Sequence, residues 1–219
     1  MSRVIILGVG PGDSQYMTLR GVELVRQADV VAGFKTVLAT ADPWISGERL
    51  VMDYKNQEDV LARVGQAVAA GKRCVVCAAG DPSVSARELV ERVRRACGDV
   101  EIVPGISSIQ MAAALAGIPF EESLFLTLHK RAPAESDVAE LATALQEDRR
   151  HLIVLPRPFD LMPADIARRL LAAGVAPSRG VRVYEELARP AQRARSFTLG
   201  ELAQAQEPFS DLSVLVFPK

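Results

Sequence analysis

Short apolar runs rich in β-branched residues alternate with segments of helical period along the whole chain, and this alternation restricts the possible folds most strongly. The first runs predicted as strands lie at residues 4–7, 30–32, 74–78 and 100–103. Between them apolar side chains recur at helical spacing, as at Leu61, Val64 and Val68. Because strands alternating with helices form sheets covered on both faces, we predict an α/β protein with a largely parallel sheet.

A second series of such segments follows in the other half of the chain. Strands are predicted at residues 124–128, 152–155, 181–184 and 213–217, helices at 136–147 and 162–173, and loops at 134–136 and 188–195. Between the two series, Gly117 and Pro119 end a helix, and Glu121 begins an exposed connection. The 219 residues suffice for two domains of about 100 residues each. We therefore predict two α/β domains, residues 1–120 and 121–219.

Charge and hydropathy exclude two classes of partner. The 26 Lys and Arg residues nearly balance the 27 Asp and Glu residues, so the net charge of −1 provides no overall positive field for nucleic acid. Polar residues interrupt every apolar run before it reaches the roughly 18 residues that cross a bilayer. We expect no nucleic-acid partner and no membrane partner.

The cysteines and histidines predict neither a disulfide framework nor a metal site. An odd number of cysteines, three, favours a reducing compartment, and we expect a cytoplasmic protein. Cys74 and Cys77 fall in one strand run, where positions i and i+3 point to opposite faces. His129 and His151 are isolated, so no metal ligand set is predicted.

Three loops carry candidate chemistry, and each directly follows a predicted strand. The first is Gly8-Val9-Gly10-Pro11-Gly12-Asp13, whose spacing differs from GxGxxG and whose proline removes a phosphate-binding N–H. The second, Gly80-Asp81-Pro82, presents a carboxylate suited to a cationic or amine-bearing ligand, or begins a turn and caps a helix. The third, Pro104-Gly105-Ile106-Ser107-Ser108, offers hydroxyls that cap a helix or bind a ligand.

Together, in this order, the three loops resemble those of the tetrapyrrole (corrin/porphyrin) methylases, which are S-adenosylmethionine-dependent methyltransferases. The resemblance covers nearly the whole chain. It implies two α/β domains, with the methyl donor S-adenosyl-L-methionine in a cleft between them and the macrocycle in an adjoining trough. It also suggests a homodimer.

The resemblance assigns roles to individual residues. It implies donor contacts at Pro11, Gly80, Asp81, Val84, Ser107, Ser108, Pro156 and Leu187. Candidates for binding a corrin precursor are Gly10 and, for its carboxylates, Lys35, His129, Lys130 and Arg131. Asp13 is the candidate general base, with a solvent water as the alternative. Arg92, Arg94 and Arg95 are predicted to lie on an exposed helix face instead.

Three segments narrow the resemblance to the cobalamin-pathway C5-methylases. Residues 126–131 are similar to their Ser-Leu-His-Gly-Arg segment, with Thr127 for Ser and Lys130 for Gly. Residues 106–112 also match, as does the tail 183–187 followed by 195–202. Residues 83–85 depart from the family's usual aromatic-Gly ending after Gly-Asp-Pro. The subgroup implies methylation at C5 of cobalt-precorrin-7 or its metal-free counterpart. A separate protein would then methylate C15 and remove a carboxylate.

Other functions remain open from the sequence. A family member acting on another ring position, or on uroporphyrinogen, would use the same donor. A non-catalytic module would bind the donor without turnover, although Gly10-Pro11-Gly12 and Gly80-Asp81-Pro82 are intact. A nicotinamide oxidoreductase would need GxGxxG and an acidic residue after the second strand, and both are missing.

Overall fold

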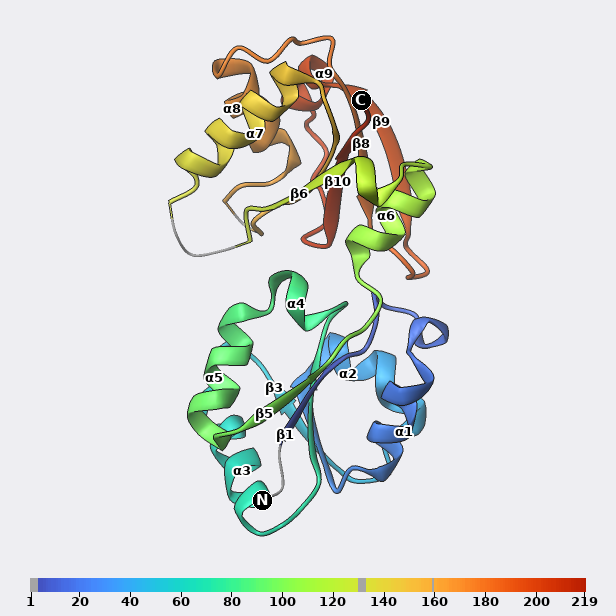
Figure 1. Cartoon of the computed structure of the whole chain (residues 1–219), viewed down its shortest axis with the longest axis vertical. Coiled ribbons are helices and arrows are strands. Elements are labelled where there is room, and N and C mark those ends of the chain that lie inside the picture. Colours follow the sequence, from blue (N-terminus) through green and yellow to red (C-terminus); the bar gives the residue numbers. More distant parts are fainter. Residues whose placement is uncertain (1–3, 130–132, 159) are drawn as a thin grey trace. The chain divides into compact units, whose positions relative to one another are not determined.

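The chain forms two compact units, each built on its own five-stranded sheet (Figure 1). The structure, a computed structural model, describes residues 4–129, 133–158 and 160–219. The units comprise Met1–Ser107 and Ser108–Lys219. The division falls earlier than the expected boundary near residue 120, because helix α6 (Ser108–Ala116) packs on strands β7 (His151–Leu155) and β10 (Ser213–Phe217) of the second sheet.

The first sheet is wholly parallel. Its strands are β1 (Val4–Gly8), β2 (Val30–Phe34), β3 (Glu48–Met52), β4 (Cys74–Ala78) and β5 (Val100–Val103). They lie in the order β3-β2-β4-β1-β5, and every neighbouring pair is parallel. The carboxyl ends of all five strands therefore lie at one edge, where ligands bind in open α/β sheets.

Helices cover both faces of this sheet (Figure 1). The helical segments of the first unit are η1 (Ser14–Tyr16), α1 (Leu19–Gln27), α2 (Lys35–Ala41), η2 (Asp42–Trp44), α3 (Gln57–Ala69), α4 (Pro82–Ser85) and α5 (Arg87–Cys97). One core packs Val25 of α1 and Leu38 of α2 against one face. The other packs Leu61 of α3 and Val93 of α5 against the opposite face. Burial on both faces explains why the central strands are almost uninterrupted apolar runs.

The strand position of the first two cysteines is confirmed. Cys74 lies in the core beside α3 and α5, whereas Cys77 lies in the core beside α1 and α2. Both are buried free thiols. Two thiols on opposite faces of one strand cannot form a redox pair or a metal clip.

Burial of Cys77 predicts a stability loss at alkaline pH. Burial raises the pKa of this thiol to about 12, whereas an unfolded thiol has a pKa of about 8.5. Between those values the unfolded chain loses a proton that the folded chain keeps, so the free energy of unfolding falls by about 1.4 kcal/mol per pH unit. Urea denaturation across this range measures the fall. The slope should be shallower in Cys77→Ala, and equal slopes would contradict the assignment.

The second sheet is mixed. Its remaining strands are β6 (Ser123–Thr127), β8 (Gly180–Glu185) and β9 (Arg193–Thr198), and the order is β6-β7-β10-β8-β9. Strand β6 is parallel to β7, while β10 is antiparallel to both β7 and β8. Strands β6, β7 and β8 therefore run in one direction, and their carboxyl ends share an edge.

The predicted loop through residues 188–195 is wrong at its end. Strand β9 begins at Arg193 and pairs with β8 along its whole length. Two arginines in the first three residues concealed the strand, because charged residues are uncommon in strands. Strand β3 was not predicted either, since Glu48 and Arg49 occupy its first two positions.

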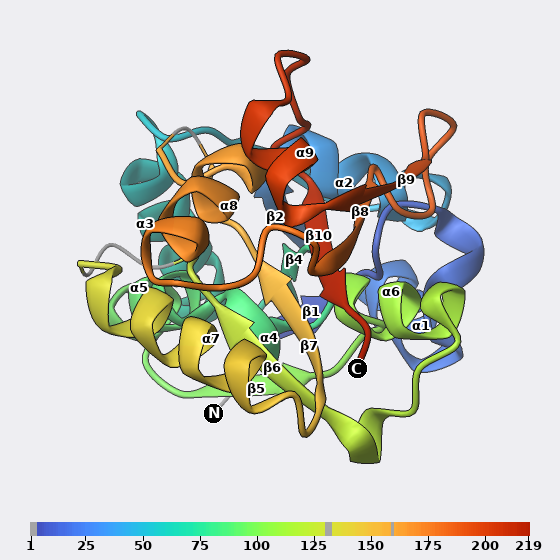
Figure 2. The same cartoon turned by 90° about the horizontal axis from the view of Figure 1, so that it is seen from above.

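Helices also cover both faces of the second sheet. Figure 2 shows α6 on one side, with α7 (Glu135–Glu147), α8 (Pro163–Ala172) and α9 (Leu199–Gln204) on the other. A short turn, η3 (Phe120–Glu122), precedes β6. Leu141 of α7, Leu170 of α8 and Leu202 of α9 join one core with alternate residues of β7, β8 and β10.

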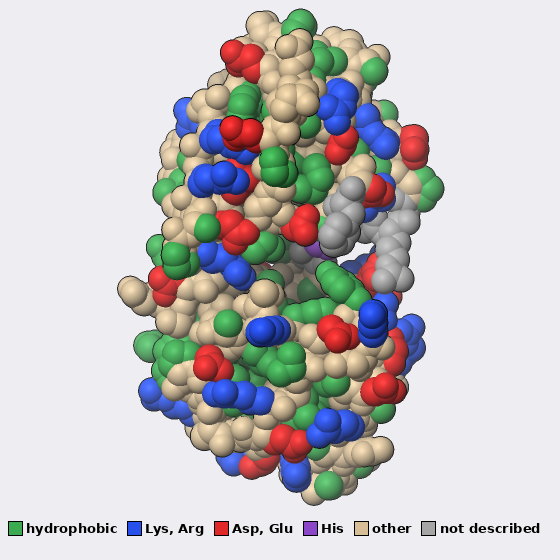
Figure 3. All heavy atoms as spheres, turned by 180° about the vertical axis from the view of Figure 1, so that it is seen from behind, with side chains coloured by type: hydrophobic (Ala, Val, Ile, Leu, Met, Phe, Trp, Pro, Cys, Tyr) green, Lys and Arg blue, Asp and Glu red, His purple; other side chains and the backbone are tan. Residues whose placement is uncertain are grey.

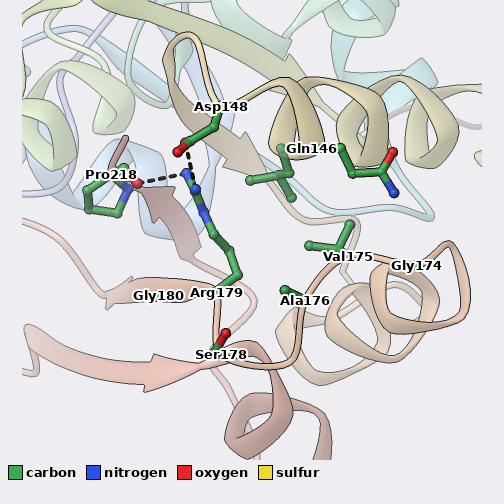
Figure 4. Close-up of a pocket in the computed structure, with 10 residues that line it drawn as sticks. Gln146, Asp148, Gly174, Val175, Ala176, Ser178, Arg179, Gly180 and Pro218 are labelled. Atoms are coloured by element: carbon green, nitrogen blue, oxygen red, sulfur yellow. Dashed lines mark hydrogen bonds and ion pairs between the residues drawn. The ribbon is translucent and has the colours of Figure 1, made fainter.

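A cavity of about 590 Å³ lies at the edge of the second sheet where β8 begins and β10 ends (Figure 4). Arg179 extends along it, donating from Nη1 to Asp148 Oδ1 at 2.6 Å and from Nη2 to the Pro218 carbonyl at 2.8 Å. The guanidinium thereby ties the end of α7 to the end of β10. This edge is opposite the carboxyl ends of β6, β7 and β8, so the cavity is separate from the candidate site below.

Replacing Arg179 by Met should lower stability without altering ligand binding. The two hydrogen bonds engage a largely buried guanidinium, so we expect a loss of about 1–2 kcal/mol in the free energy of unfolding. Arg149→Met is the control, because the Arg149 side chain is 81% exposed and lies 3.8 Å from its carboxylate partner. Urea denaturation compares the two variants. Equal losses would show that the buried contacts stabilise nothing.

Candidate functional site

The loops after β1, β4 and β5 come together at the carboxyl edge of the first sheet. Gly10 and Gly80 exchange backbone hydrogen bonds, with N–H to carbonyl distances of 3.3 and 2.8 Å. The loop after β5 is equally close: a Cβ on Gly105 would lie 2.4 Å from the Gly80 oxygen and 2.6 Å from the Gly8 oxygen. No side chain fits at such separations. The glycines of the three predicted loops therefore form one backbone junction.

Positive φ angles shape this junction. Gly10 has φ of 87° and Gly80 has φ of 61°, values that residues with a Cβ seldom adopt. Pro11 follows the first of them and is partly exposed. The Gly12 carbonyl accepts a hydrogen bond from Thr40 Oγ1 at 3.2 Å, which fastens the loop to α2. The first residue of that helix, Lys35, is exposed at the same sheet edge.

Both candidate aspartates cap a helical segment. Asp13 accepts the Gln15 N–H at 2.8 Å and caps η1, while Asp81 accepts the Ser83 N–H at 2.7 Å and caps α4. Asp81 therefore has the capping role that the Asp81-Pro82 sequence suggested. Because a carboxylate can accept about four hydrogen bonds, capping leaves Asp81 able to accept more from a ligand.

The remaining candidates of the first loops lie around α4 and the start of α6. Val84 lies in α4 and is half-buried. Ser107 is 2% exposed and directly precedes α6, whereas Ser108 is the first residue of that helix and is half-buried. The two serines also mark the division between the units.

The second unit places its candidates at one sheet edge too. His129 follows β6, is exposed, and donates its backbone N–H to Thr127 Oγ1 at 3.1 Å. Pro156 follows β7 and is buried. Leu187 follows β8 and is 3% exposed. Lys130 and Arg131 lie outside the described residues.

Sequence reasoning missed several charged residues at this edge. Arg157 follows Pro156 and pairs with Asp160 at 2.7 Å, and Arg189 pairs with Glu186 at 3.7 Å. Glu185 ends β8 with no exposed surface. A glutamate directly after the predicted strand 181–184 was the one available signal, because a buried acid there needs partners from elsewhere in the fold.

Arg92 also differs from its prediction. Its side chain is 17% exposed and pairs with Glu58 of α3, so it belongs to a helix contact and not to a solvent face. Arg94 and Arg95 are exposed, as predicted. On the face drawn in Figure 3, Lys and Arg side chains are interspersed with Asp and Glu, in agreement with the small net charge.

In the part of the chain that the structure describes, no three His, Cys, Asp or Glu side chains lie close enough together to hold a metal ion. Nor does any helix among those residues have the length and apolar character needed to cross a membrane.

A family model of Tetrapyrrole (Corrin/Porphyrin) Methylases matches residues 3–203. The chain belongs to this family. Tetrapyrrole methylases are S-adenosylmethionine-dependent methyltransferases, so the predicted family, enzyme class and methyl donor are confirmed at that level.

Two curated relatives of this methylase match almost all of it. It is 31% identical to "Siroheme synthase" of Neisseria meningitidis serogroup C over 97% of the chain but 47% of the relative, so it spans about half the length of the siroheme synthases it matches. It is 28% identical to "Probable cobalt-precorrin-7 C(5)-methyltransferase" of Methanocaldococcus jannaschii, over 98% of the chain and 97% of the relative.

Solved structures share the fold. The crystal structure of the methyltransferase CobJ matches with a TM-score of 0.81 and 22% identity, covering 100% of this chain and 95% of that chain. The two-domain α/β fold that the resemblance implied is therefore confirmed.

Proposed function

We propose that this tetrapyrrole methylase transfers a methyl group from S-adenosylmethionine to C5 of cobalt-precorrin-7 or its metal-free counterpart. The observation that carries the methyl-donor part is the backbone junction of Gly8, Gly10, Gly80 and Gly105. The ring position is supported by segments 126–131 and 183–187, and by the similarity to the Methanocaldococcus relative.

The residues at the junction suit this donor chemically. S-adenosylmethionine bears an ammonium group, a sulfonium and ribose hydroxyls, all of which favour acceptor oxygens. Asp81 provides a carboxylate at the end of β4, directly after Gly80, whose positive φ sets the turn between them. We propose that Pro11, Val84, Ser107, Ser108, Pro156 and Leu187 contact the donor as well.

The protein's main contribution to the rate would be positioning. When bound, the donor supplies an electrophilic methyl group on a positively charged sulfur. The sulfur leaves as a neutral thioether, so the leaving group needs little acid catalysis. Holding the acceptor carbon in line with that methyl group removes most of the entropic part of the barrier. Rigid loops fastened by the Gly10–Gly80 hydrogen bonds suit this role.

Asp13 is the proposed base for the proton that the acceptor carbon loses. Asp13→Asn should keep the cap on η1, because Asn caps as well as Asp does. We expect kcat to fall about 100-fold, the lower range for one acid or base, with unchanged affinity for S-adenosylhomocysteine. Single-turnover kinetics and calorimetry measure the two effects. An unchanged kcat would assign the proton to solvent water.

Cationic side chains would hold the acetate and propionate groups of the corrin precursor. We propose Lys35, His129, Lys130 and Arg131 for this role, with Gly10 approaching the ring. Of these, Lys35 and His129 are described and exposed at the carboxyl edges of their sheets. Carboxylate recognition of this kind weakens with ionic strength.

Uroporphyrinogen is the second candidate acceptor. The 31% identity to a siroheme synthase across 97% of the chain favours it. Both acceptors would use the same donor, so donor binding alone does not distinguish them.

Methyl transfer from isotope-labelled S-adenosylmethionine distinguishes the acceptors. Purified protein is incubated separately with cobalt-precorrin-7, metal-free precorrin-7, uroporphyrinogen III and no acceptor. We expect label in a precorrin-7 product, with the new methyl at C5 by carbon NMR. Label in the uroporphyrinogen product alone would overturn the C5 proposal and support the second candidate.

A further inference from the structure

Glu185, the last residue of β8, is a fully buried carboxylate beside the segment that carries Leu187. Oε1 accepts hydrogen bonds from Arg193 Nη2 at 3.0 Å and from the Ser210 N–H at 2.9 Å. Oε2 accepts one from Arg195 Nη2 at 3.0 Å. An acid without exposed surface is costly unless such partners compensate it, so the arrangement depends on the negative charge.

The partners of Glu185 are themselves held in place. Arg195 donates to Glu207 at 2.9 Å, and its guanidinium lies 4.5 Å from the centre of the Phe209 ring. Arg193 is paired with Glu185 in the β8–β9 register. The carboxylate thus joins β8, β9 and the chain around Ser210 at one point.

Two of the next three residues, Glu186 and Ala188 on either side of Leu187, have an unusual backbone. Glu186 has φ of 51° and Ala188 has φ of 59°, which costs about 1 kcal/mol or more at each residue and persists only where the surroundings enforce it. Glu186 donates its N–H to the Leu212 carbonyl at 3.1 Å and accepts the Ser210 hydroxyl at 2.5 Å. Ser210 therefore bonds to Glu185 through its backbone and to Glu186 through its side chain.

We propose that Glu185 is a positioning residue for donor binding, which holds segment 186–188, and Leu187 within it, in the conformation that contacts S-adenosylmethionine. The inference rests on the proposed function, because it takes Leu187 as a donor contact. Glu185 and Glu186 belong to segment 183–187, which the family resemblance matched without giving these two residues a role. The proposal gives them one.

Two variants of the full chain test the proposal. Glu185→Gln keeps the shape but removes the charge between the two arginines. Ser210→Ala keeps the N–H bond to Glu185, and it removes the hydroxyl bond to Glu186 together with the bond that Ser210 Oγ accepts from the Leu212 N–H at 3.1 Å. We expect Kd for S-adenosylhomocysteine and KM for S-adenosylmethionine to rise about tenfold in the first variant, and less in the second. At saturating donor, kcat should return to the wild-type value, which a general loss of folded enzyme would not allow.

Glu207→Gln is the matched control. Like Glu185, Glu207 pairs with Arg195, but its side chain is 77% exposed. None of the hydrogen bonds given above joins Glu207 to segment 186–188. Its donor affinity should equal that of the wild type. Wild-type affinity in both Glu185→Gln and Ser210→Ala would overturn the positioning role, and Ser210→Ala decides alone if Glu185→Gln does not fold. Absence of binding to the wild-type protein would overturn the proposed function itself, and this role with it.

Discussion

Gly105→Ala is expected to abolish measurable donor binding and to lower stability. The new Cβ would lie 2.4 Å from the Gly80 oxygen and 2.6 Å from the Gly8 oxygen, both of them backbone atoms. Neither can turn aside as a flexible side chain would, so the loops after β1, β4 and β5 must separate. Overpacking of this kind costs about 1–3 kcal/mol.

Urea denaturation and calorimetric titration with S-adenosylhomocysteine measure the two effects. Gly180→Ala is the control, because a Cβ on Gly180 meets no heavy atom within 4 Å. It should leave both quantities unchanged. A Gly105→Ala protein with wild-type affinity would show that the junction is not part of the donor site.

Asp81→Asn is expected to weaken donor binding by about 10- to 100-fold without changing the melting temperature. Asparagine is used because Asp81 caps α4 through the Ser83 N–H, and alanine would remove the cap as well as the charge. Asn caps as well as Asp does, so only the charge is lost. A hydrogen bond to a charged group contributes about 1.5–3 kcal/mol, which gives the expected range.

Asp53→Asn is the matched control for this variant. Asp53 follows β3 at the same sheet edge and accepts the N–H groups of Lys55 and Asn56 at 2.7 and 2.8 Å. Asp53 therefore accepts backbone N–H groups as Asp81 does, but it is not one of the residues of the glycine junction. Equal affinities of Asp81→Asn and Asp53→Asn for S-adenosylhomocysteine would remove Asp81 from the site.

The elements that could be predicted from the sequence are those whose pattern is local. Strand β4 reads Cys-Val-Val-Cys-Ala and is buried on both faces, so a continuous apolar run identifies it. Strand β9 reads Arg-Ala-Arg-Ser-Phe-Thr, and its two arginines are stabilised by Glu185 on another strand. That contact depends on the strand pairing, which the sequence does not display.

The candidate site likewise has features that the sequence predicts and features that it does not. The loops at Gly10, Gly80 and Gly105 were each predicted to follow a strand of a largely parallel sheet, and in such a sheet the loops after the strands lie at one edge. Their contact at backbone distance was not predictable, since it depends on β1 lying between β4 and β5. The placement of α6 in the second unit, and thus the division after Ser107, likewise depends on packing against β7 and β10.

Calorimetric titration of the wild-type protein with S-adenosylhomocysteine, with NADH as the comparison, tests the central claim most directly. It measures donor binding without needing the macrocycle. The account predicts saturable binding of S-adenosylhomocysteine and no binding of NADH. Folded protein that binds NADH, or that leaves S-adenosylhomocysteine unbound, would contradict the assignment of the Gly8–Gly80–Gly105 junction as a methyl-donor site.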